Sequence, residues 1–249
     1  PVVVLLKDTE ASEATVKLTN TTYQIDLSQN LTGFLQDAFA KIITDPDMIP
    51  WLPVEQDQAI GNLHPERGFA QRVLTRLCID FVFLHEMAHI VGGHVDAKKA
   101  RDNLSGGLSE FYLIGRAPDY DERAHAWEFE ADTIAAALLD GAIDTLIHDA
   151  KGQKLNEDDR SFLGHPDIAV EHIGVMTISA LYTLFRLLRE TQGRLQKIGY
   201  HPDPLVRAFG CRDVILHRLS HRYEVDRERF DEMLIYHLMT FDDALSDCG

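Results

Sequence analysis

Three histidines and one glutamate fall within twelve positions of an otherwise apolar stretch, "FLHEMAHIVGGH" at residues 83–94. Burying imidazoles and a carboxylate without polar partners is costly, so something must satisfy them. His85, Glu86 and His89 form an HExxH motif. Two histidines four residues apart on a helix are separated by about 40° in projection and about 6 Å along the axis, so both can face one ion. The spacing therefore predicts a metal site on a buried helix.

The residue between the two histidines suggests what the metal would do. Zinc accepts imidazole and carboxylate ligands and lowers the pKa of a bound water toward about 7. Glu86 follows His85 directly, so a helix turns it aside from the ligands, where it can take a proton from that water. The apolar flanks "FVFL" and "IV" argue against a chance motif on a solvated helix. We therefore predict one zinc ion per chain, with Glu86 as general base.

Two sources compete for the third protein ligand that a catalytic zinc site normally has. His94 is one, although on a continuing helix it would project about 140° away from His89. The other is "WEFEAD", in which Glu128 and Asp132 share one face of a second helix. Such a glutamate can complete the site, and the aspartate can accept the free N–H of a ligand histidine. Glu130 projects about 160° from Asp132 and is expected to be a solvated or structural carboxylate.

These side chains must be positioned by a fold that is mainly α, or formally α+β. Residues 2–28 alternate and are rich in Val, Thr and Ile, which predicts two or three strands. Helical patterns follow Leu31 up to Pro46, over 68–99, 122–150, 168–192, after Pro204 and over 226–245. Gly92-Gly93 falls where the second of these helices could bend or end. We expect a single domain over 1–249, with a β-containing portion at 1–67 and a helical catalytic core at 68–249.

Composition narrows the classes of partner. The formal charge is −16, from 40 acidic and 24 basic side chains, which disfavours nucleic acid and anionic membrane surfaces as partners. The longest uncharged apolar stretch, 173–185, is shorter than the roughly 20 residues of a membrane-spanning helix. The three cysteines are scattered and form no CxxC motif, which is typical of a reducing compartment. We expect a soluble, cytoplasmic protein.

The order of three motifs resembles a known group of peptidases. "HEMAHIVGGH" at 85–94 is followed by "EFEAD" at 128–132 and "HPDPLVR" at 201–207. HExxH followed by ExxxD is the gluzincin pattern. The finer resemblance is to the branch that holds the HtpX heat-shock protease, the CAAX prenyl endopeptidase and their soluble relatives. The phage-exclusion peptidase Lit and its relatives also look similar in having a soluble HExxH domain.

The resemblance implies a zincin-like helical core built around an active-site helix. It implies zinc ligation by three residues: His85, His89 and Glu128. It places Glu86 as general base, and His201 or Arg207 near the substrate to stabilise an oxyanion. The expected reaction is hydrolysis of a peptide bond in a peptide or protein. The rival interpretation is a catalytically inert zinc-binding domain that acts as a regulator or interaction module, and such a domain has no chemical need for Glu86.

Overall fold

The computed structural model describes residues 2–6, 13–18, 21–26, 31–44, 65–102, 122–151, 168–194 and 202–246. The described residues are mainly helical, as the sequence predicts. Seven helices lie in them: α1 (Leu31–Thr44), α2 (Pro65–Val91), α3 (His94–Asp102), α4 (Glu122–Lys151), α6 (Ala169–Arg194), α7 (Pro204–Arg222) and α8 (Arg227–Ser246). Their bounds lie within a few residues of the predicted ranges, except that the helix predicted over 68–99 is divided in two.

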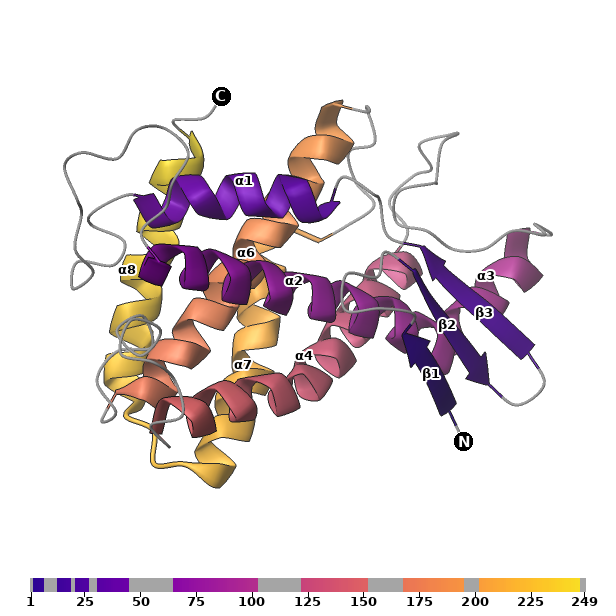
Figure 1. Cartoon of the computed structure of the whole chain (residues 1–249). Helices are drawn as coiled ribbons and strands as arrows, with labels where there is room; N and C mark the ends of the chain where they lie inside the picture. Colours follow the sequence, from indigo (N-terminus) through magenta and orange to yellow (C-terminus); the bar gives the residue numbers. More distant parts are fainter. Residues whose placement is uncertain are drawn as a thin grey trace.

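Three strands pair in the order β1 (Val2–Leu6), β2 (Glu13–Leu18) and β3 (Thr21–Asp26). Both pairings are antiparallel, with Val4 opposite Val16 and Val16 opposite Tyr23. Threonine and β-branched residues fit such a pleated ribbon. β2 and β3 contact α2, so the strands lie beside the helix that carries the HExxH motif (Figure 1).

The centre of the helical part is α6, which packs against α2, α4, α7 and α8 (Figure 1). Residues 169–181 of this helix are all buried. Two of the hydroxyl groups on this helix are satisfied by its own backbone, because Thr177 and Thr183 donate to the carbonyl oxygens of Ile173 and Ser179 at 2.7 and 3.0 Å. The buried hydroxyl of Ser179 has no hydrogen-bond partner among the described residues. The apolar stretch at 173–185 is therefore core. Among the described helices, none is long and apolar enough to cross a membrane.

The break between α2 and α3 is set by Gly92-Gly93. The N–H of Gly92 still donates to the carbonyl of Ala88, but Gly93 adopts a φ of +75°, a left-handed conformation that only glycine reaches readily. The chain then turns and α3 begins at His94. The break that the double glycine predicts is thus present, and its direction matters for the site.

The start of α7 is encoded in "HPDPLVR". Asp203 is the N-cap residue, and its carboxylate accepts from the N–H of Leu205 at 2.9 Å. Pro204 occupies the first helical turn, where its missing N–H is harmless. This cap fixes where α7 begins, and Arg207 follows within the first turn.

Gly174 of α6 lies where α7 and α8 approach this helix closely, and its substitution tests the packing. A Cβ at this position would lie 2.8 Å from Cε2 of Phe230 on α8 and 2.9 Å from Cδ1 of Leu219 on α7. We predict that Gly174→Ala lowers the free energy of unfolding by about 1–3 kcal/mol because the core is overpacked. Gly141→Ala is the matched control, since a Cβ at Gly141 meets nothing within 4 Å.

In urea denaturation the control should gain about 0.5–1 kcal/mol from helix propensity. Equal stabilisation by both alanines would contradict the close approach of α6 to α7 and α8.

Candidate metal centre

Two helices bring three ligand atoms to one point. Nε2 of His85 and Nε2 of His89, both on α2, lie 3.0 Å apart. The carboxylate of Glu128 on α4 lies opposite, with its two oxygens 3.4 Å from Nε2 of His85 and 3.4 Å from Nε2 of His89. All three ligand atoms lie within 4.8 Å of one another. The three residues form a cluster that could bind a metal ion.

The dimensions of this cluster suit zinc. With zinc–ligand bonds of about 2.0–2.1 Å and tetrahedral angles, ligand atoms are separated by about 3.3 Å. The two histidine nitrogens are 3.0 Å apart, and each lies 3.4 Å from a different oxygen of Glu128, so the distance from each nitrogen to its nearer carboxylate oxygen is close to that value. The two imidazoles are 2% and 6% exposed, and the Glu128 side chain is 13% exposed. Two nitrogens and one carboxylate also match the donor set that zinc accepts in catalytic sites.

A buried carboxylate holds the first histidine from behind. Oδ1 of Asp132, one turn after Glu128 on α4, lies 2.9 Å from Nδ1 of His85. Asp132 is in turn held by Arg207 of α7, whose Nε and Nη2 both donate to it at 2.8 Å. The guanidinium stacks over the ring of Phe185 on α6, with its Cζ 4.2 Å from the ring centroid. A chain of contacts thus joins α2, α4, α7 and α6.

The charge of Asp132 depends on those partners. Burial raises the pKa of this carboxyl group, but the Arg207 guanidinium and His85 outweigh burial and hold the pKa below its ordinary value. Asp132 is therefore ionised at neutral pH and suited to accept the Nδ1–H of His85. Because the folded-state pKa is lowered, this pair contributes stability above about pH 4 and loses it as the pH falls further.

The expectation that the helix carries His94 away from His89 is wrong. The turn at Gly92-Gly93 brings His94 back, so that its Nδ1 lies 2.9 Å from Nδ1 of His89. The other nitrogen of His94, Nε2, lies 3.2 Å from Oε2 of Glu130. The side chain of Glu130 is 57% exposed and is solvated as expected, but it also contacts His94. Burial, followed by the nearby His89, lowers the pKa of His94 below its ordinary value.

The remaining candidate residues are not among the three that could bind a metal ion. Glu86 is buried on α2 next to His85 and is not one of the three converging residues. His125 lies half-buried on α4, also outside that group. Arg207 is 3% exposed and contacts Asp132 with two of its donors, whereas its Nη2 lies 3.7 Å from Glu128. His201 lies outside the described residues.

Sequence reasoning missed the contacts of His94 with His89 and Glu130. The double glycine after the HExxH motif is the signal that could have found them, because a left-handed residue at Gly93 ends α2 and changes the direction of the chain. The ring of Trp127 on α4 stacks on His94, with centroids 5.4 Å apart and planes 15° apart.

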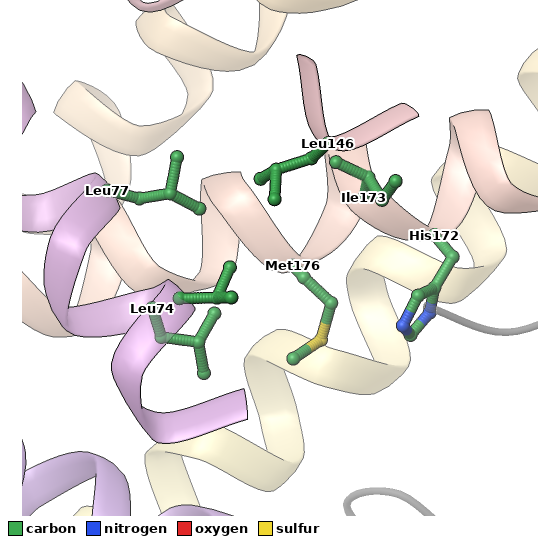
Figure 2. A pocket seen from close by; sticks show the side chains of 7 residues that line it. Leu74, Leu77, Leu146, His172, Ile173 and Met176 are labelled. Carbon is green, nitrogen blue, oxygen red and sulfur yellow. The ribbon is translucent and has the colours of Figure 1, made fainter. Parts of the chain in front are cut away.

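A cavity elsewhere in the helical part is not a substrate site. It lies among α2, α4 and α6 and is lined by aliphatic and thioether side chains such as Leu74 and Met176, with His172 as the single polar residue (Figure 2). Its volume is about 10 Å³, enough for the centre of one water molecule. None of the converging ligand residues lines it, so the chemistry and the cavity are separate.

Comparison of the chain with family models, with curated proteins and with solved structures finds no match. The interpretation of the centre therefore depends on its own geometry and on the motifs in the sequence.

The contact between Arg207 and Asp132 can be tested through stability. Arg207→Met removes the guanidinium and leaves a buried, ionised Asp132 without its main partner, so we predict a loss of about 3–5 kcal/mol in the free energy of unfolding. Arg76→Met is the control, because Arg76 pairs with Asp80 at 2.8 Å on an exposed face of α2. The control should lose less than about 1 kcal/mol. Similar losses for the two variants in urea denaturation would contradict a structural role for the buried pair.

Proposed function

We propose that this chain is a zinc-dependent metalloendopeptidase of the gluzincin type, with a zincin-like helical core. The observation that carries the proposal is the convergence of His85, His89 and Glu128 from two helices on one point. The presence of Glu86 beside the first ligand, and the order of the three motifs shared with the HtpX and CAAX endopeptidase branch, support peptide hydrolysis over simple metal storage.

The residues of the chain would divide the work as follows. Zinc, when bound by His85, His89 and Glu128, supplies Lewis acidity that lowers the pKa of water on its open position and polarises a carbonyl group. The carboxylate of Glu86 takes the proton from the attacking water and passes it to the leaving amine. Asp132 holds His85 in the tautomer whose Nε2 is free to ligate.

The resemblance gives two candidates for stabilising the oxyanion, His201 and Arg207. Arg207 uses its Nε and Nη2 on Asp132 and is 3% exposed, which favours a positioning role for it. We therefore propose His201, which precedes the N-cap of α7 by two residues, as the donor to the oxyanion.

The alternative function is a catalytically inert domain that holds zinc for structural or regulatory purposes. The high burial of both histidines favours it, because structural zinc sites are closed. The three-ligand set and Glu86 favour the enzyme. The two functions share the metal centre and differ in whether Glu86 is needed, which makes them separable by experiment.

The metal centre itself is tested by zinc content. We predict about one tightly held zinc per chain in wild type, and loss of that zinc in Glu128→Ala, because one of three protein ligands is removed. Asp149→Ala, a substitution near the other end of α4, is the control and should retain zinc. Zinc is measured by mass spectrometry of the element after dialysis against a mild chelator, and zinc binding should also raise the thermal stability of the metal-free protein.

A second pair of histidines could also bind zinc and must be controlled for in this measurement. His217 and His221 lie exposed and four residues apart on α7, with ring centroids 4.3 Å apart, so they can hold a divalent ion weakly. The titration is therefore repeated in a His217→Ala/His221→Ala background. Zinc-free wild-type protein with an unchanged melting curve after zinc addition would refute the metal centre, and zinc retained by Glu128→Ala would refute its third ligand.

The catalytic role of Glu86 is tested by Glu86→Gln. The amide keeps the shape of the side chain but cannot take a proton, so we predict retained zinc and a loss of peptidase activity of about 10²–10⁴-fold. Cleavage of a mixed peptide library by wild type, by this variant and by the metal-free protein is followed by mass spectrometry. Equal cleavage by wild type and Glu86→Gln would exclude the general base, and a zinc-loaded wild type without cleavage would favour the inert domain.

A further inference from the structure

The contacts behind the second metal ligand form a line from the surface to the proposed zinc site. Glu130 Oε2 lies 3.2 Å from His94 Nε2, and His94 Nδ1 lies 2.9 Å from His89 Nδ1. The opposite nitrogen of the same ring, His89 Nε2, faces His85 and Glu128. His94 is 4% exposed, so its nitrogens must find partners within the protein.

When a metal occupies Nε2 of His89, only one assignment of protons satisfies the contacts from His89 through His94 to Glu130. A ligating Nε2 must carry a lone pair, so the single proton of neutral His89 sits on Nδ1. That proton can be donated to His94 only if Nδ1 of His94 is unprotonated, which puts the proton of His94 on Nε2. Nε2–H of His94 then donates to the carboxylate of Glu130. The hydrogen bonds of this line therefore all point the same way: His89 donates to His94, and His94 donates to Glu130.

We propose that His94, supported by Glu130, is a positioning residue that fixes the tautomer and ring orientation of His89 and so keeps Nε2 of His89 available to the metal. The proposal rests on the proposed metal centre. His89 is then supported in the same way as His85. Asp132 contacts His85 directly, whereas Glu130 acts on His89 through the imidazole of His94.

The local backbone is built to place His94 there. Gly93 is in the left-handed region, and a Cβ on Gly92 would lie 2.8 Å from Nε2 of His94 and 3.0 Å from the carbonyl oxygen of Ala88. Both glycines are therefore needed for the imidazole to turn back against His89. Trp127 of α4 stacks on the His94 ring and so fixes the plane of that ring.

His94 does not fit the role of a fourth protein ligand. The two nitrogens of an imidazole lie on different edges of the ring, and His94 contacts the Nδ1 edge of His89 while the ligand cluster lies at the Nε2 edge. An ion bound to Nε2 of His89 is therefore out of reach of Nδ1 of His94. Among the described residues, only His85, His89 and Glu128 bring ligand atoms together in this way.

The proposal is tested first on the metal-free protein, by long-range ¹H–¹⁵N correlation of the histidine rings. In wild type, we expect the proton of His89 on Nδ1. His94→Ala should give a mixture of tautomers for His89. His94→Asn, whose amide oxygen can occupy nearly the place of Nδ1, should restore the Nδ1–H form. His148→Ala, at an exposed position of α4, is the control and should leave His89 unchanged.

Zinc affinity gives the second measurement, made by competition with a chelator of known affinity. His94→Ala should weaken zinc binding by about 10–100-fold, as expected for loss of an orienting partner, and His94→Asn should recover most of it. Gly92→Ala keeps every imidazole but displaces His94, so it should weaken zinc binding in the same direction. Glu130→Ala should have the smallest effect because water can replace an exposed carboxylate.

The outcomes separate this inference from the proposed function. If wild type binds zinc and His94→Ala leaves both the His89 tautomer and the zinc affinity unchanged, the positioning role is refuted and the metal centre stands. Complete loss of zinc in both His94 variants would make His94 a ligand and would also refute the positioning role. If wild type binds no zinc, the proposed function fails, and the tautomer of His89 in the His94 variants still decides whether His94 orients it.

Discussion

The carboxylate of Asp132 is the contact on which the rest of the arrangement depends. It lies between the guanidinium of Arg207 and Nδ1 of His85, and it is 2% exposed. A buried ion pair of this kind is stable only with good geometry and further hydrogen bonds, and here the two-pronged contact with Arg207 supplies them. Because His85, Asp132 and Arg207 come from α2, α4 and α7, their contacts fix how these helices meet. The position of Glu128 is fixed at the same time, since it lies one turn from Asp132 on α4.

The same environment favours a cation at the ligand cluster. The carboxylates of Glu86, Glu128 and Asp132 outnumber the guanidinium of Arg207, which gives these four side chains a formal charge of −2 in a region with little solvent. A divalent ion neutralises that charge, and the low exposure of His85 and His89 strengthens the attraction. The two histidines differ in their support, since the partner of His85 is a buried carboxylate while the line behind His89 ends at exposed Glu130.

Much of the centre could be predicted from spacing, because a helix fixes the relation of residues four apart. That rule put His85 with His89, and Glu128 with Asp132. It failed for His94, since one left-handed residue at Gly93 redirects the chain and periodicity carries no information about that turn. The partner of Arg207 was also beyond local reasoning, because Arg207 and Asp132 are 75 residues apart and meet only through helix packing. The helices were foreseen from their apolar patterns, whereas which helices meet was not.

The separation of these residues along the chain has a consequence for how the protein matures. A ribosome releases the two histidines first, then Glu128 and Asp132, and only much later Arg207, which follows Asp132 by 75 residues. The nascent chain thus carries the HExxH segment before the packed helices that shape the centre have been made, and domains acquire their tertiary structure as units. The surroundings of the ligand cluster are consequently complete only after α7 has docked, and an ion bound there would be held tightly only from that point.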